Sequence, residues 1–241
     1  MSRKDLIFIL KSFVVWRAGL LAALFLAIKS VPLQANFLGG GLQNYLANPY
    51  FWAWGNFDGE HYLAIARFGY QPLTYFFFPL YPLLIKLFGE TQLSALVISH
   101  LSLIIGLFGF YKLVRLDYSA KIAKLSIILL LAFPTSFFFG GVYTESLFLA
   151  LAVWFFWFLR KRKWLGVILL GSLASATRLV GAVLLVPFGL LGYMYYLLKT
   201  TGDPLAFIHN IALFGGQRSE SIVLLPQVFY RYFFKIIPNL N

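Results

Sequence analysis

Carboxylates are scarce in this chain, so their positions are informative. The 241 residues include only 8 Asp and Glu residues. Two of them stand in the run Asp58-Gly59-Glu60-His61, which has aromatic residues on both sides. A carboxylate beside aromatic rings at headgroup level suits a site where a polar group meets a lipid-embedded one, and it could act as general base on a hydroxyl. Alternatively, Asp58 caps a helix that starts at Gly59; the two readings are compatible.

A second acid and one arginine stand at the ends of apolar runs. Glu145 follows Tyr143-Thr144 at the start of such a run, where the helix dipole favours an acidic residue. Arg178 interrupts an apolar stretch, and a charge at membrane depth is costly unless it is paired or faces a polar cavity. Its planar guanidinium could bind a phosphate, and a purely structural ion pair is the alternative.

Other residue types narrow the chemistry. His61 could assist the base or bind a phosphate oxygen, whereas His100 lies in an apolar run and is expected to be a hydrogen-bonded core residue. No H-x-x-x-H, Walker or G-x-G-x-x-G arrangement occurs, so zinc hydrolysis and nucleotide binding lack support. The chain has no cysteine, which excludes disulfides and thiolate metal sites. We expect neither a metal nor a cofactor.

The composition is that of a membrane protein. Hydrophobic residues make up 61% of the chain and charged residues 12%, against roughly 45–50% and about 25% in soluble domains. The net charge of +12 does not indicate nucleic-acid binding, because the basic residues form short clusters between apolar runs rather than one patch. The expected fold class is all-α: a polytopic transmembrane helical bundle in a lipid bilayer, with a large first non-cytoplasmic loop.

The apolar runs predict the membrane-spanning elements. Residues 6–28 predict a retained first span, and residues 93–113, 125–139 and 146–159 predict further spans. Residues 164–198 exceed one crossing, so we expect a hairpin that turns near residues 178–181. The run 76–88 contains Pro79 and Pro82 and predicts an interfacial or re-entrant helix. A polar loop is expected over 199–220, before a last apolar segment at 222–237.

Clusters of basic residues predict the orientation of these spans. The clusters at 112–124 and 160–163 mark one side as cytoplasmic, together with the N-terminus. The loop 29–75, the turn 140–145 and the turn at Arg178 then face the other side. Asp58, Glu60, Glu145 and Arg178 are therefore expected to converge on one non-cytoplasmic surface.

Several blocks of sequence resemble a known family. They follow in the family's order: Trp54-Gly55-Asn56-Phe57-Asp58-Gly59-Glu60-His61-Tyr62 with Ile65-Ala66 and Gly69-Tyr70, Phe77-Phe78-Pro79-Leu80-Tyr81-Pro82, Pro134-Thr135-Ser136 with Tyr143-Thr144-Glu145-Ser146-Leu147-Phe148, Ser175-Ala176-Thr177-Arg178-Leu179-Val180-Gly181, and the run 202–207. The family is GPI mannosyltransferase II (PIG-V), and the match is to its prokaryotic relatives.

The resemblance implies a single transmembrane glycosyltransferase domain over residues 1–241, of the GT-C fold. Such enzymes move a sugar, usually mannose, from a polyprenyl-phosphate donor to a glycan or glycolipid acceptor on the non-cytoplasmic face. Asp58 would be the catalytic base of an inverting transfer, and Arg178 would hold the phosphate, with His61 assisting. Glu60, Tyr143 and Glu145 would contribute to substrate binding. The compact loops favour a prokaryotic plasma membrane.

Some residues depart from the family pattern. Phe57 stands where the family has Trp directly before the acid, and Val180 stands where it has Asn. Relatives continue with more spans beyond the point where this sequence stops, so C-terminal spans are expected to be missing. The competing functions are a flippase or transporter and a non-catalytic assembly subunit. The lack of an inverted repeat with paired broken helices weighs against a secondary transporter.

Overall fold

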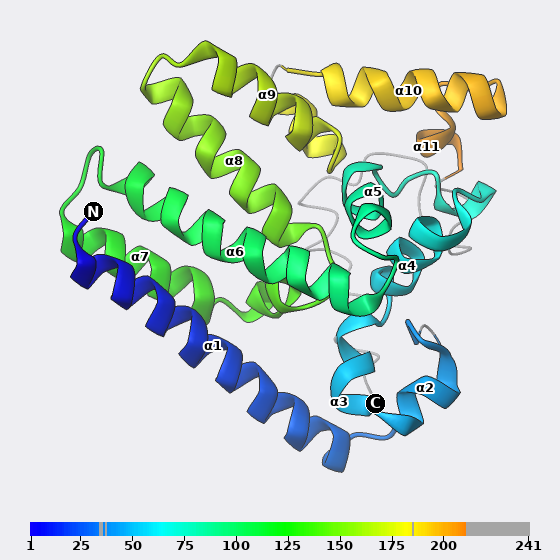
Figure 1. Cartoon of the computed structure of the whole chain (residues 1–241), viewed down its shortest axis with the longest axis horizontal. Coiled ribbons are helices and arrows are strands. Elements are labelled where there is room, and N and C mark those ends of the chain that lie inside the picture. Colours follow the sequence, from blue (N-terminus) through cyan, green and yellow to red (C-terminus); the bar gives the residue numbers. More distant parts are fainter. Residues whose placement is uncertain (34–35, 37, 185, 211–241) are drawn as a thin grey trace, which may run out of the picture.

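Helices form the whole regular structure of the described residues. The computed structural model describes residues 1–33, 36, 38–184 and 186–210, and no strand occurs among them. The predicted segment 222–237 and residues 211–220 of the predicted polar loop lie outside the described residues. Figure 1 shows the elements in chain order: α1 (Arg3–Ser30), α2 (Gly41–Ala47), α3 (Pro49–Trp52), η1 (Ala53–Gly55), α4 (Asp58–Phe68), η2 (Pro72–Thr74), α5 (Leu80–Leu87), α6 (Gln92–Val114), α7 (Ala120–Ala132), η3 (Pro134–Gly140), α8 (Glu145–Arg160), α9 (Trp164–Ser175), η4 (Leu179–Leu184), α10 (Phe188–Thr201) and α11 (Ala206–His209).

Two helices are long and apolar enough to cross a membrane. They are α1, with 28 residues, and α6, with 23 residues, at the places where spans were predicted. A third crossing is present if α7 and η3 count as one broken span, since they meet at an angle of 85°. The bend follows from Pro134, which lacks an N–H group and forces Phe133 into the extended region, with ψ of 136°. These apolar helices indicate association with a membrane.

The two later predicted spans are shorter in the structure than a full crossing. α8 has 16 residues and α9 has 12, whereas a span needs about 20. The chain does break near Arg178, as predicted. The segment that follows is the 3₁₀ helix η4, which packs back onto α9 so closely that a Cβ on Gly181 would lie 2.2 Å from the Ala174 carbonyl oxygen. α10 then runs away from the start of α9 toward α11 (Figure 1).

The pair α6 and α8 forms the centre of the bundle. α6 presents small residues to its partner, and a Cβ on Gly106 would lie only 3.4 Å from the backbone of Ala150. The Trp154 indole N–H crosses to the Ile105 carbonyl oxygen of α6 at 3.0 Å. Small residues that let two backbones approach are the usual basis of helix packing in lipid.

The predicted loop 29–75 is largely helical and is attached to the first helix. The Arg17 guanidinium donates to the Gly140 carbonyl oxygen at 3.1 Å and stacks 3.8 Å from the ring centroid of Trp54. One residue earlier, the Trp16 indole N–H donates to Ser136 Oγ at 3.1 Å. These contacts explain how an apolar helix accommodates an arginine: its charge meets a carbonyl and an aromatic face.

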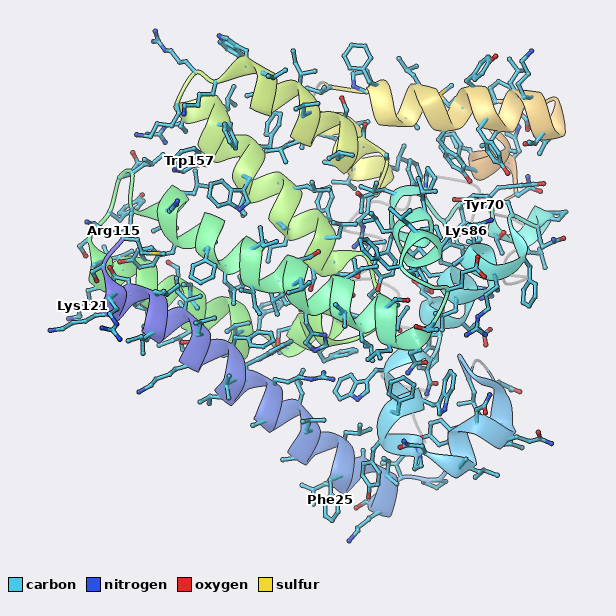
Figure 2. The ribbon with its side chains drawn as sticks, in the orientation of Figure 1. Phe25, Tyr70, Lys86, Arg115, Lys121 and Trp157 are labelled. Atoms are coloured by element: carbon cyan, nitrogen blue, oxygen red, sulfur yellow. The ribbon has the colours of Figure 1, made fainter. Side chains whose placement is uncertain are left out.

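Basic residues and their acidic partners gather at one end of the molecule. Lys124 pairs with Asp5 at 2.9 Å, and the Arg160 guanidinium forms a bidentate ion pair with the Asp117 carboxylate at 2.7 and 2.9 Å. The Arg160 guanidinium lowers the pKa of the Asp117 carboxyl. Figure 2 shows Arg115 and Lys121 at this end, with Tyr70 and Lys86 at the other. The first-loop helices therefore lie opposite the basic end, as the charge clusters predict.

Because the chain has no cysteine, single-cysteine variants can test the orientation. Tyr118 and Phe68 are both exposed, at 57% and 77%. Tyr118 is bonded to Arg115 of the basic end, and Phe68 ends α4, two residues before Tyr70 at the other end. In right-side-out vesicles, a membrane-impermeant maleimide is expected to label Phe68→Cys directly and Tyr118→Cys only after permeabilisation. Labelling of both variants from the same side would contradict the predicted arrangement.

Candidate functional site

Three charged residues from distant parts of the sequence line one cavity. Asp58, Glu145 and Arg178 border a hollow of about 250 Å³ between the start of α4, the start of α8 and the turn after α9. This volume accommodates one small polar group rather than a whole lipid. The cavity is completed by Tyr62, Phe76, Phe77, Phe78, Tyr143, Thr144, Thr177 and Leu179. Of the four charged residues expected to converge, these three border one cavity and Glu60 does not.

An unusual backbone conformation places Asp58 at the start of its helix. Phe57 occupies the N-cap position with φ of 56° and ψ of −123°, which is strained for a residue with a large side chain. The helix begins at Asp58 itself, so the cap is Phe57 and not Asp58, contrary to the capping alternative. The Gly59 N–H and the Tyr143 hydroxyl both donate to the Asn56 carbonyl oxygen, at 3.2 and 3.1 Å. These bonds hold the turn that presents Asp58.

The segment 141–144 ties this turn to α8. The Val142 N–H donates to the Trp54 carbonyl oxygen at 2.8 Å. A Cβ on Gly59 would lie 3.2 Å from Val142 Cβ, so only a very small residue fits between Asp58 and Glu60. The glycine of the Asp-Gly-Glu run thus serves a packing function, which brings α4 against the segment that leads into Glu145.

Glu145 and Arg178 form an ion pair at the cavity wall. Arg178 Nη1 donates to Glu145 Oε1 at 2.7 Å, and the two side chains are 40% and 26% exposed. Glu145 Oε2 is buried and has no hydrogen-bond partner among the residues that the structure describes. An arginine carries five N–H donors, and this contact uses one. The pair therefore keeps unused donors and one unused acceptor beside the cavity.

Three polar residues of the cavity were given no role from the sequence: Tyr62, Thr144 and Thr177. Tyr62 follows Asp58 by one helical turn, and that spacing would have placed it on the same face. Its side chain is 6% exposed. Burial raises the pKa of the Tyr62 hydroxyl, helped by the charges of Asp58 and Glu145, while a hydrogen bond with Thr144 opposes the shift. Burial raises the pKa of Tyr143 in the same way. Both tyrosines are neutral donors near pH 7. Tyr143 had been assigned to substrate binding, whereas no sequence signal gave Thr144 or Thr177 a role.

Glu60 and His61 do not line this cavity. Their side chains lie beside each other, with His61 Nε2 at 3.6 Å from Glu60 Oε1. The His61 ring lies 5.1 Å from the ring of Phe77, which does border the cavity. His61 therefore packs against Phe77 of the cavity wall but does not border the cavity itself. His100, expected in the core, is hydrogen-bonded to the Leu96 carbonyl oxygen at 2.6 Å.

Hydrogen bonds join the remaining sequence blocks around the cavity. The Leu80 N–H donates to the Ala176 carbonyl oxygen at 2.9 Å, which connects α5 to the turn that carries Arg178. Tyr81 and Ser99 share a buried bond of 2.7 Å, and Ser99 Oγ also donates to the Tyr143 carbonyl oxygen at 3.4 Å. Among the described residues, no group of three or more His, Asp and Glu side chains could hold a metal ion.

Known proteins add no identification. No protein-family model, no curated protein and no solved structure matches this chain. The resemblance to GPI mannosyltransferase II thus stays a prediction that rests on the sequence blocks. The described residues form a helical, membrane-associated chain, and Asp58, Glu145 and Arg178 border one of its cavities.

A double-mutant cycle tests the ion pair of the cavity. Arg178→Gln is expected to lower the free energy of unfolding, because Glu145 then keeps a largely buried charge without its partner. The double variant E145Q/R178Q is expected to lose less than the sum of the single variants, by on the order of 1 kcal/mol at this exposure. Thermal unfolding of the purified proteins in one detergent measures the difference.

The more exposed pair of Arg160 and Asp117 provides the matched control, since those side chains are 52% and 45% exposed. R160Q and D117N are expected to be closer to additive. Simple additivity at Glu145 and Arg178 would show that the two residues are not energetically coupled.

Proposed function

We propose that this chain is a membrane glycosyltransferase that moves a sugar from a polyprenyl-phosphate donor to a hydroxyl of a glycan or glycolipid acceptor. The sequence resemblance favours mannose as the sugar. The observation that carries the proposal is the shared cavity, where the carboxylate of Asp58 and the guanidinium of Arg178 border the same 250 Å³ hollow. A base and a phosphate-binding cation on one small polar cavity match the needs of transfer from a sugar phosphate.

The proposed reaction is a single inverting displacement at C1 of the sugar. Asp58 accepts the proton of the acceptor hydroxyl while the hydroxyl oxygen forms its bond to C1. The bond between C1 and the phosphate oxygen breaks, and its electron pair leaves with the polyprenyl phosphate. Arg178 stabilises the charge that develops on that phosphate, and Glu145 orients the guanidinium. Tyr62 and Tyr143 stay protonated and keep the site polar without adding charge.

The proposal includes a multi-pass arrangement of GT-C type in a prokaryotic plasma membrane. Two apolar helices of crossing length, and a third if the bent pair is one span, support a membrane location. The basic end and the Asp58 cavity lie on different parts of the molecule, which supports a reaction on the non-cytoplasmic face. Many large apolar side chains are exposed, among them Val15, Leu26 and Leu169 at 71%, 63% and 56%.

Asp58→Asn is the direct test of the base. The amide keeps the shape of the side chain but cannot take the proton, so transfer is expected to fall by about 10²–10⁴-fold. The measurement is transfer of radiolabelled mannose from polyprenyl-phosphate-mannose in membranes that contain equal amounts of each protein. Asp117→Asn makes the same chemical change at the basic end and is expected to keep wild-type activity.

Full transfer by Asp58→Asn would contradict the proposed mechanism. Lipid movement or partner binding that survives this substitution, without any transfer by the wild type, would favour the flippase or assembly-subunit function instead.

A further inference from the structure

A groove lies between α1 and the C-terminal half of α7, and it ends at the bend that follows α7. It has a volume of about 660 Å³ and lies apart from the Asp58 cavity. Figure 1 shows α1 diverging from α7 along this part of the bundle. The walls are mostly apolar side chains of the two helices: Phe8, Val15, Trp16, Gly19 and Leu20 from α1, and Ile128, Leu131, Ala132, Phe133 and Pro134 from α7 and the bend after it.

The groove has the length of one membrane leaflet. Its α1 residues run from Phe8 to Leu20, about 18 Å along the helix at ~1.5 Å per residue. Half of a hydrocarbon core of ~30 Å is close to this length. The hydrogen bond between Trp16 and Ser136 lies at the bend that ends the groove. A Cβ on Gly19 would meet no atom within 4 Å, so the groove is open at this position.

One cation stands at this groove. Lys11 lines it, and in the part of the chain that the structure describes its ammonium makes no ion pair or hydrogen bond. Two other charges of α1 have partners, since Asp5 binds Lys124 and Arg17 binds the Gly140 carbonyl oxygen. Arg3, Lys4 and Lys29 lie at the two ends of the helix and do not line the groove. Lys11 lies two helical turns inside α1, where an ammonium group reaches the interface along its own aliphatic stem. A cation there, above an apolar groove, complements an anionic headgroup above a hydrocarbon chain.

We propose that the groove between α1 and α7 binds one anionic phospholipid, with an acyl chain along Phe8, Val15 and Gly19 and the headgroup phosphate on Lys11. Ser12, also on the groove, is a hydroxyl donor beside the same phosphate. The site requires only that α1 crosses the membrane. It does not depend on the proposed sugar transfer, so either can fail without the other.

The test compares two lipids that differ only in headgroup charge. Purified protein is mixed with phosphatidylglycerol or phosphatidylcholine of the same acyl chains, and native mass spectrometry measures the bound fraction of each. Wild-type protein is expected to retain phosphatidylglycerol preferentially. Lys11→Gln is expected to reduce that preference roughly fivefold, the contribution of one lysine at an anionic surface. Gly19→Phe fills the groove and is expected to reduce retention of both lipids.

Lys121→Gln is the matched control, because Lys121 lies on α7 at the basic end of the molecule and does not line the groove. It is expected to keep the wild-type preference. The proposal is overturned if wild-type protein binds both lipids equally. It is also overturned if Lys11→Gln keeps the full preference, if Lys121→Gln loses as much as Lys11→Gln, or if Gly19→Phe retains lipid normally. The comparison of lipids on the wild type needs no variant to fold.

Discussion

A charge in so apolar a chain needs a partner, because few water molecules or counter-ions are at hand to compensate it. This requirement organises the structure. Arg17 meets a carbonyl group and a tryptophan ring and thereby fixes α1 to the first-loop helices. Asp5 joins α1 to Lys124 of α7, and Asp117 joins the connection after α6 to Arg160 at the end of α8. The contact between Arg178 and Glu145 brings the turn after α9 onto the start of α8.

The same requirement links stability with the proposed chemistry. The contact that compensates Arg178 also borders the cavity of Asp58, and it leaves Glu145 Oε2 buried without a partner among the described residues. A buried acceptor without a partner costs free energy, and a strained Phe57 adds to that cost. Such strain persists where surrounding hydrogen bonds hold the backbone in place. Here the Tyr143 hydroxyl and the Gly59 N–H both donate to the Asn56 carbonyl oxygen, next to Phe57. These costs are concentrated around Asp58.

The sequence was sufficient to predict the features that depend on local composition. These are the all-helical class of the described part and the long apolar helices α1 and α6. The basic clusters assign the loops of Asp58, Glu60, Glu145 and Arg178 to one side, and all of these except Glu60 border the same cavity. The helices within 29–75 and the φ of Phe57 depend on contacts between distant segments, which one sequence does not show. The bounds of α8 and the start of α9 follow the apolar runs, but at 16 and 12 residues both helices are shorter than a full crossing.

Occupation of the cavity by a lipid phosphate is the claim on which the account most depends. A photoreactive benzophenone side chain at Leu179, which lines the cavity, can be compared with one at Leu169, which is exposed on α9 outside it. After irradiation with radiolabelled polyprenyl phosphate, the account predicts several-fold more label at position 179, removed by an excess of unlabelled polyprenyl-phosphate-mannose. Equal labelling at both positions, or label that the competitor does not remove, would contradict it.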